Sequence, residues 1–198
     1  MPKQIENAGW ERVGSDTFST GSRWSHGVYD DKPSRVELGI VDGKYRFNVE
    51  LNEGWRRFQK APYRDVVNLY AAVDFKLVSS TAAKPAFGLL FSKVGNAEYK
   101  FCLKVFPNGN WFRLERFDGA ALRLLIDWTS TPVKLDELNR MGVLVENQHI
   151  QLFINSELVG EQREPTFTGG KVGLSVEAES AGSVVVDFDN FELRAPPK

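Results

Sequence analysis

Aromatic and basic side chains lie close together in two parts of this sequence, and this composition suits the binding of sugars. The first part, residues 52–64, is predicted to be a loop and carries Trp55, Arg56, Arg57, Tyr63 and Arg64. The second is one side of a predicted strand, with Trp111, Arg113 and Glu115 at alternate positions. Aromatic rings stack on the apolar C–H faces of sugars, and planar side chains with many donors satisfy their hydroxyls. These residues are therefore the candidate ligand-binding residues.

Four further polar side chains join the second group if their strands share its concave sheet: Asn68, Tyr70, Lys100 and Lys104. The basic residues of 52–64 can also clamp a carboxylate, which favours acidic glycans such as uronates slightly over neutral ones. A simpler alternative is structural, with Trp55 and Phe58 pinning the loop, and Trp24 or Trp128 plugging the ends of the fold. Both interpretations stay open at this point.

The elements that must position these side chains are β-strands. Apolar residues alternate with polar ones along most of the chain, so each strand is expected to have one buried and one solvated face. The last third is predicted to be four strands, ELNRMGVLVEN, HIQLFINSELVG, GGKVGLSVEAES and SVVVDFDNFELR. Asp42-Gly43 and Asp118-Gly119 are typical of hairpin turns. About eleven to twelve strands result, with a short edge strand near 16–18, and the spacing favours an all-β, two-sheet antiparallel sandwich.

Length and composition favour one domain over residues 1–198, with an irregular arm at 1–15 and a tail at 194–198. The formal charge is -1, so no global field draws the protein to nucleic acid or to an anionic membrane, and no apolar run is long enough to insert into one. The start of the chain lacks a signal-peptide pattern. A cytoplasmic location is expected if the chain is complete, and an extracellular one if it is an excised domain. The oligomeric state stays open.

Phrases spread over nearly the whole chain resemble those of concanavalin A-like, laminin-G-like jelly rolls, including the bacterial domain named for 3-keto-disaccharide hydrolases. They include Asp16-Thr17-Phe18, Phe87-Gly88-Leu89-Leu90-Phe91, Ile150 to Asn155, Gly170-Lys171-Val172-Gly173-Leu174 and Val186-Asp187-Phe188-Asp189-Asn190-Phe191. The resemblance implies a jelly roll of two curved sheets, often with a carbohydrate-binding concave face. Members differ in ligand, so no single ligand is implied.

Catalytic and metal-binding patterns are sparse. Glycoside hydrolases on this type of fold resemble one another through Glu-x-Asp-x-x-Glu on one strand, and no glutamate here has an aspartate two residues on. Asp187 and Asp189 are spaced to share one side of a strand, but two carboxylates are too few for calcium unless loop carbonyls complete the site. His26 and His149 lack metal-ligand spacing and are expected at the surface. We expect no cofactor, with calcium left open.

Three hypotheses follow. The first is a non-catalytic carbohydrate-binding module that uses the 52–64 loop and the adjoining concave sheet. The second is a sugar-active hydrolase or lyase, with carboxylates or Tyr63 and Arg64 as acid and base. The third is a domain that binds another protein through the same aromatic loop or a sheet edge.

Overall fold

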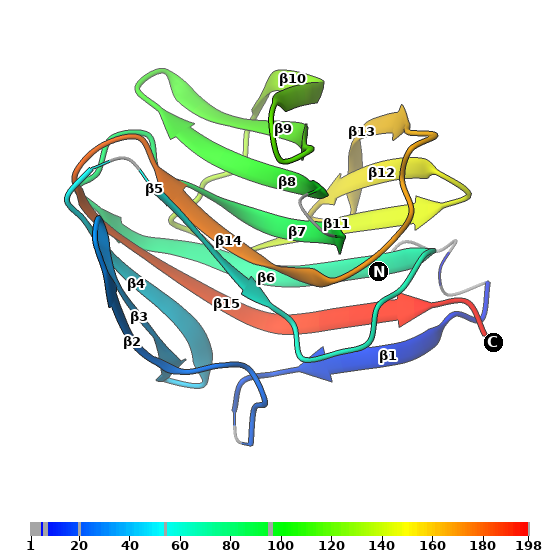
Figure 1. The fold of residues 1–198 in the computed structure, drawn as a ribbon, viewed down its shortest axis with the longest axis horizontal. Coiled ribbons are helices and arrows are strands. Elements are labelled where there is room, and N and C mark those ends of the chain that lie inside the picture. Colours follow the sequence, from blue (N-terminus) through cyan, green and yellow to red (C-terminus); the bar gives the residue numbers. More distant parts are fainter. Residues whose placement is uncertain (1–4, 6–7, 20, 54, 95–96, 198) are drawn as a thin grey trace.

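The structure is a computed structural model that describes residues 5, 8–19, 21–53, 55–94 and 97–197, with the backbone alone at 55–58 and 92–94. Figure 1 shows two layers of antiparallel strands, as the sequence predicted. The nine-stranded sheet has the order β13 (Glu157–Arg163), β12 (His149–Ile154), β11 (Asn139–Glu146), β6 (Leu69–Ser80), β15 (Gly182–Ala195), β4 (Lys44–Leu51), β3 (Ser34–Val41) and β2 (Gly27–Asp31). Strand β1 (Glu11–Asp16) also pairs with β15.

The six-stranded sheet has the order β10 (Leu122–Thr131), β9 (Gly109–Phe117), β8 (Ala97–Phe106), β7 (Ala86–Val94), β14 (Val172–Ala178) and β5 (Trp55–Lys60). The core lies between the sheets because alternate side chains of each strand point inward. Aromatic side chains from both sheets meet there; Phe75 of β6, for example, lies 5.3 Å from Phe87 of β7, measured between ring centroids. No helix in the described part of the chain is long and apolar enough to cross a lipid bilayer.

Turn residues end the strands where the sequence predicts hairpins. Asp42 and Gly43, at φ 52° and 71°, join β3 to β4. Asp118 follows β9, and its Oδ1 accepts hydrogen bonds from the backbone N–H groups of Ala120 and Ala121. A glycine or a short polar residue tolerates these left-handed or tightly turned conformations at little cost.

The number of strands in the last third was predicted wrongly. HIQLFINSELVG is a hairpin of β12 and β13 rather than one strand, so this part of the chain contains five strands instead of four. The turn is made by Asn155 and Ser156, at φ 50° and 71°. Asparagine adopts this conformation readily, but serine does so less often, and the apolar alternation on both sides hid the turn.

Predictions about the 52–64 loop and about both ends of the chain also need correction. The supposed loop at 52–64 contains the edge strand β5, whose backbone pairs with β14 along its whole length. The predicted arm at 1–15 is strand from Glu11 on, and the edge strand expected near 16–18 ends at Asp16. At the other end, β15 runs to Ala195, into the expected tail.

Ile5 and Trp10 cover part of the outer face of the nine-stranded sheet. Ile5 and Trp10 form a second apolar cluster there with four sheet residues, Tyr70, Ala72, Leu144 and Phe153. The Arg194 guanidinium donates a hydrogen bond to the carbonyl oxygen of Trp10 at 3.1 Å and holds this segment on the sheet. The outer face is therefore buried at its centre, although the alternation predicted a solvated face.

Candidate functional site

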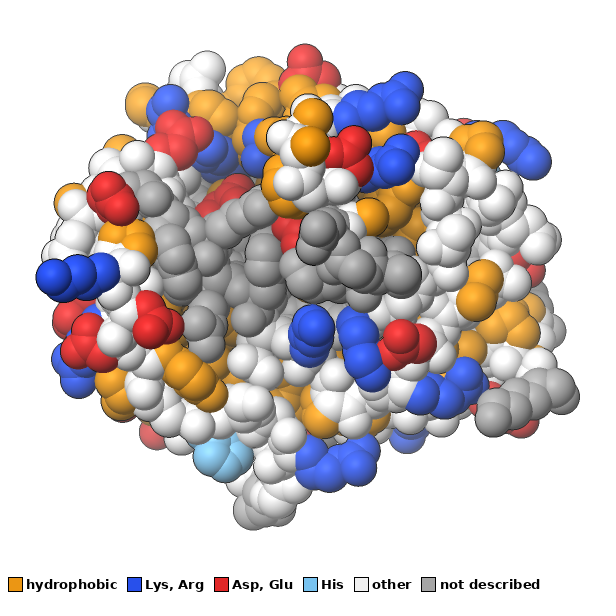
Figure 2. Space-filling model, in the orientation of Figure 1, with side chains coloured by type: hydrophobic (Ala, Val, Ile, Leu, Met, Phe, Trp, Pro, Cys, Tyr) orange, Lys and Arg blue, Asp and Glu red, His pale blue; other side chains and the backbone are white. Residues whose placement is uncertain are grey.

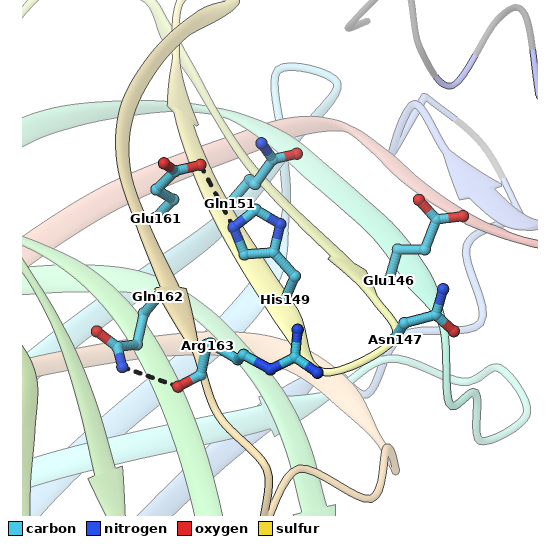
Figure 3. A pocket seen from close by; sticks show the side chains of 7 residues that line it. All are labelled: Glu146, Asn147, His149, Gln151, Glu161, Gln162 and Arg163. Atoms are coloured by element: carbon cyan, nitrogen blue, oxygen red, sulfur yellow. Dashed lines mark hydrogen bonds and ion pairs between the residues drawn. The ribbon is translucent and has the colours of Figure 1, made fainter.

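Charged side chains of both signs are interspersed on the face of the molecule in Figure 2. Two polar regions of the described surface are candidates for ligand binding. One is a hollow of about 620 Å³ at the edge of the nine-stranded sheet, lined by polar side chains from β11, β12 and β13 (Figure 3). We call it the β12–β13 hollow. The other is the face of the six-stranded sheet that points away from the core, which we call the charged face and which holds five of the predicted site residues.

The charged face is built by strand alternation. In β8, Phe101 and Leu103 point into the core, so Lys100, Cys102 and Lys104 point away from it. In β9, Phe112 and Leu114 lie in the core in the same way. This leaves three predicted site residues on the charged face: Trp111, Arg113 and Glu115. Strand pairing then sets Lys100 opposite Glu115 and Lys104 opposite Trp111.

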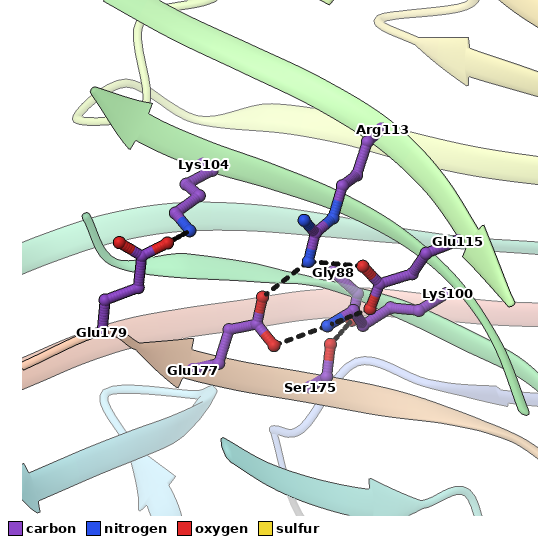
Figure 4. A network of polar contacts seen from close by, with 8 residues as sticks. All are labelled: Gly88, Lys100, Lys104, Arg113, Glu115, Ser175, Glu177 and Glu179. Carbon is purple, nitrogen blue, oxygen red and sulfur yellow. Dashed lines mark hydrogen bonds and ion pairs between the residues drawn. The ribbon is translucent and has the colours of Figure 1, made fainter. Parts of the chain in front are cut away.

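Two cations and two carboxylates form a closed network at the centre of this face (Figure 4). The Lys100 ammonium lies 2.7 Å from a Glu115 oxygen and 2.6 Å from a Glu177 oxygen of β14. The Arg113 guanidinium pairs with the second carboxylate oxygen of Glu115, and it lies 3.6 Å from the second carboxylate oxygen of Glu177. The side chains of Lys100 and Glu115 are only 1 % and 3 % exposed, so the network is buried although it lies outside the core.

Gly88 makes the network sterically feasible. Lys100 of β8 and Glu177 of β14 are separated by β7, and Gly88 is the β7 residue opposite both Cys102 and Ser175. A Cβ at position 88 would lie 2.0 Å from the carbonyl oxygen of Phe101, so the strands approach too closely there for any side chain. The missing side chain leaves space for Lys100 to reach across β7.

The network keeps Lys100 and Glu177 charged. Burial by itself raises the pKa of Glu177, but the neighbouring Lys100 and Arg113 outweigh burial and leave that pKa below its usual value. Burial likewise acts to lower the pKa of Lys100, and the carboxylates of Glu177 and Glu115 raise it well above its usual value. Burial raises the pKa of the Cys102 thiol to about 12, so this thiol is protonated and inert at neutral pH.

A group of aromatic rings borders the network, and we call it the aromatic rim: Phe106, Trp111 and Trp128. Phe106 contacts both tryptophans edge to face, with ring centroids 6.2 Å from Trp111 and 5.2 Å from Trp128. All three residues are partly exposed. The Arg113 guanidinium lies 4.4 Å and the Lys104 ammonium 5.4 Å from the Trp128 ring centroid, within cation–π range. Rings and cations therefore share one surface.

A second ion-pair group lies beside the rim and is more exposed. Lys104 pairs with one carboxylate oxygen of Glu179, and Lys84 lies 3.0 Å from the other. The hydrogen bond from Lys104 lowers the pKa of Glu179. The side chains of Lys84 and Glu179 are 43 % and 50 % exposed, so both are accessible to a ligand.

Two predicted site residues lie elsewhere, because β6 belongs to the nine-stranded sheet. Tyr70 is buried under Trp10 on the outer face of that sheet. Asn68 lies just before β6, where its Oδ1 accepts a hydrogen bond from the backbone N–H of Asn147 at 3.0 Å. The expectation that these residues share a sheet with Lys100 and Trp111 is therefore wrong. Alternation predicts which side chains share a face of one strand, but not which sheet that strand joins.

The remaining predicted residues lie in β5, the edge strand of the six-stranded sheet, or in the connection that follows it. Trp55, Arg56 and Arg57 lie in β5, where Arg56 is in register with Glu177, but their side chains are outside the described part. Arg64 is exposed in the β5–β6 connection.

Tyr63, in the same connection, stacks on Phe191 at a centroid distance of 5.9 Å, and its hydroxyl donates to the carbonyl oxygen of Ser15. Burial, together with the nearby Asp16, raises the pKa of Tyr63. A raised pKa keeps this phenol protonated at neutral pH, and its proton is already donated to Ser15, so Tyr63 is not placed to act as a base.

The pair Asp187 and Asp189 does not form a common site for a cation. Both carboxylate oxygens of Asp187 accept hydrogen bonds from the Arg46 guanidinium, at 2.6 and 2.8 Å. The Asp189 carboxylate instead accepts a bond from the backbone N–H of Asn190. Among the residues with described side chains, no cluster of three or more histidine, cysteine or acidic groups is placed to hold a metal ion.

Five residues of the charged face, its rim and the neighbouring ion-pair group were not predicted as site residues: Lys84, Phe106, Trp128, Glu177 and Glu179. Glu177 had a usable signal, since it stands on the non-core parity of β14, between Val176 and Ala178. Trp128 lacked such a signal because irregularities in the pairing of β10 with β9 interrupt its alternation.

No protein-family model and no curated protein matches the sequence. Solved structures do resemble the fold. A carbohydrate binding module, CBM66 from Bacillus subtilis, has 15% sequence identity and a TM-score of 0.57, and the match covers 94% of this chain and 96% of that chain. The laminarinase catalytic domain from Thermotoga maritima has 10% identity and a TM-score of 0.66, over 96% and 99% of the two chains.

A third similar structure is the kappa-carrageenase from Pseudoalteromonas carrageenovora, with 12% identity and a TM-score of 0.60 over 94% of this chain and 97% of that chain. At identities this low, the structural similarity shows the fold and leaves the activity open. Together with the two antiparallel sheets, they show that this chain is a concanavalin A-like jelly-roll sandwich.

Proposed function

We propose that this chain is a non-catalytic carbohydrate-binding module whose ligand lies against the aromatic rim. The observation that carries the proposal is the joint placement of partly exposed rings and cations on one sheet face, with Arg113 only 4.4 Å from the Trp128 ring centroid. Rings of this kind accept the apolar faces of sugars, and the neighbouring guanidinium and ammonium groups donate to hydroxyls or carboxylates. The jelly-roll structures that this chain resembles include a carbohydrate-binding module and sugar-cleaving enzymes.

The buried network has a positioning role in this proposal. Lys100 and Glu115 are too enclosed to be the main ligand contacts, and together with Glu177 they fix the guanidinium of Arg113 against the rim. A preorganised donor loses little freedom when the ligand binds. We also assign Arg56 to the ligand-binding surface, because it is in register with Glu177 of the charged face at the edge of the same sheet.

An acidic glycan is the preferred ligand. The central network is balanced, with two cations and two carboxylates. Beside the rim, the two cations Lys84 and Lys104 face the single carboxylate of Glu179, which leaves one positive charge. A uronate or another acidic substituent complements that excess.

The protonation of the network argues against catalysis by these carboxylates. Glycoside hydrolysis needs one carboxylic acid that protonates the leaving oxygen. Glu177 has a lowered pKa, so it is not poised to donate a proton. The two carboxylate oxygens of Glu115 are each paired with a cation, one with Lys100 and the other with Arg113. A hydrolase nevertheless remains the second candidate, because one specific observation favours it: two carboxylates are held together by the same two cations on a sheet face.

The test is a glycan array of acidic and neutral polysaccharides probed with the wild type and with Trp128→Ala. Leu122→Ala, an exposed change at the other end of β10, is the control for folding and display. Arg56→Ala tests the β5 edge. We expect binding to acidic glycans that Trp128→Ala reduces and Leu122→Ala leaves intact.

Two results would count against the proposal. If the wild type binds nothing on the array, the protein-interaction hypothesis takes precedence. If sugar fragments are released from a bound polysaccharide, and Glu177→Gln stops that release, the protein is an enzyme.

A further inference from the structure

We propose that the β12–β13 hollow is a second ligand site, for an uncharged polyhydroxylated molecule such as a neutral sugar. It is independent of the charged face, because it lies on strands of the other sheet. Its volume of about 620 Å³ falls within the range of small-molecule sites.

Strand alternation directs polar side chains into this hollow. Ile150 and Leu152 of β12 point into the core, so His149 and Gln151 point outward. Pairing with β13 sets Arg163 opposite His149 and Glu161 opposite Gln151. The lining is polar throughout, and no apolar side chain contributes to it.

The side chains offer both donors and acceptors. Glu161 pairs with His149, with 3.3 Å between Oε2 and Nε2, and points toward the imidazole in Figure 3. Among the described residues, the Arg163 guanidinium and the Asn147 side-chain amide have no hydrogen-bond partner. Sugar hydroxyls both donate and accept, so carboxylate, amide and guanidinium groups around one hollow match them.

The charge balance of the lining selects against acidic ligands. Glu146 and Glu161 supply two carboxylates against the one permanent cation, Arg163. An acidic sugar would face this negative excess, whereas a neutral one would not. The preference is therefore opposite to that proposed for the charged face.

The turn beside the hollow is held in place before any ligand arrives. The backbone N–H of Asn147 donates to Asn68 Oδ1 at 3.0 Å, and the Gln148 side chain donates to the carbonyl oxygen of Pro165 at 2.9 Å. A backbone hydrogen bond from Glu164 to Gln148, at 2.8 Å, ties the end of β13 to the same turn. A preformed site loses less conformational entropy on binding.

A neighbouring hollow extends the site. It measures about 420 Å³ and shares Asn147 and Arg163 with the first, and its floor includes Phe167. In this proposal a second sugar ring occupies the neighbouring hollow, with Arg163 between the two rings. Because the only ring among the polar lining residues is the imidazole of His149, we expect weak binding, in the millimolar range.

The test is NMR titration of the ¹⁵N-labelled protein with lactose and cellobiose as neutral probes and galacturonate as the acidic probe. We expect the neutral probes to shift the side-chain amide signals of Asn147, Gln151 and Gln162 more than galacturonate does. Arg163→Gln should lower the affinity for the neutral probes by about tenfold, which is the loss typical of one charged hydrogen bond. Arg123→Gln, which removes an exposed arginine from β10, is the matched control.

Three outcomes would overturn this second site. They are the absence of shifts at these amides with both neutral probes, equal binding by Arg163→Gln and the wild type, or stronger shifts with galacturonate. The two sites fail separately, because Trp128→Ala should leave the shifts in the hollow unchanged. If the wild type binds no glycan at the aromatic rim but the neutral probes shift the amides of the hollow, only the proposed function is contradicted.

Discussion

The two sheet faces that point away from the core are both buried at their centres, but by opposite means. On the six-stranded sheet, Lys100, Arg113, Glu115 and Glu177 neutralise one another. On the nine-stranded sheet, the segment containing Ile5 and Trp10 covers an apolar cluster. Buried ion pairs seldom stabilise a protein more than well-packed apolar residues of similar size. The apolar cluster is thus the arrangement expected where burial serves stability. The buried charges of the other face are not, which indicates that they are kept for another reason, such as binding.

The largest effect is expected for Lys100→Met, which removes the ammonium shared by Glu115 and Glu177. Two buried carboxylates would then rely on Arg113 alone, and the free energy of unfolding should fall by about 3–5 kcal/mol. Urea denaturation of the variant and the wild type measures this difference in the free energy of unfolding. Lys134→Met, which breaks the exposed pair with Glu137, is the control and should change little.

A replacement of the whole network sharpens this test. If Lys100→Met, Arg113→Met, Glu115→Leu and Glu177→Leu together restore the stability lost in the single variant, the network is not retained for stability. A combined variant much less stable than Lys100→Met alone would show that the charges stabilise the fold.

A smaller effect is expected for Trp10→Ala on the apolar face. The change should cost about 2–3 kcal/mol of unfolding free energy, less than is usual for a fully buried tryptophan, because Trp10 can detach without unfolding the sandwich. Hydrogen exchange should show faster exchange in β1, with β8 and β9 unchanged. Equal acceleration in both sheets would mean that the two faces are not independent.

The pH dependence of stability should differ between the wild type and Glu177→Gln. The folded pKa of Glu177 is lowered, so the unfolded chain binds more protons in acid. The stabilisation from Glu177 is therefore complete above its unfolded pKa, near 4.5, and is lost as the pH falls through the lower folded pKa. Lys100 has a raised pKa and loses its contribution only in base. Chemical denaturation at a series of pH values should show the difference between the two proteins shrinking in acid, and a constant difference would contradict the ion pairing.

The smallest effect is expected for Lys84→Gln beside the aromatic rim. Its ion pair with Glu179 is exposed, so folding should be unaffected, while binding of an acidic glycan should weaken by about two- to threefold. Calorimetric titration at two salt concentrations measures this. The variant should bind neutral glycans as the wild type does, and an equal loss for both classes would argue against an acidic preference.

Sequence patterns predicted most of what lies within one strand or one hairpin. The turn at Asp42-Gly43 and the shared face of Trp111, Arg113 and Glu115 were correct because each depends on neighbours in the chain. The turn at Asn155-Ser156 was missed because apolar residues continue at the same spacing on both sides.

Relations between distant strands could not be predicted in the same way. The partnership of Lys100 with Glu177 spans 77 positions in sequence and depends on the missing side chain at Gly88. Tyr70 and Lys100 both stand on the side of an alternating strand that points away from the core, but the strand of Tyr70 belongs to the nine-stranded sheet. Periodicity contains no information on these assignments, which follow from how the sheets pack.

The most direct test of the aromatic rim uses the tryptophan indole N–H signals as probes of position. In an NMR titration with an oligouronate, the account predicts shifts of the Trp111 and Trp128 signals, since both rings border the charged face. The indole N–H signals of Trp10 and Trp24, which are buried in other parts of the protein, should not shift. Shifts confined to Trp10 or Trp24, or no shift at all with a glycan that the protein binds, would contradict the proposed site.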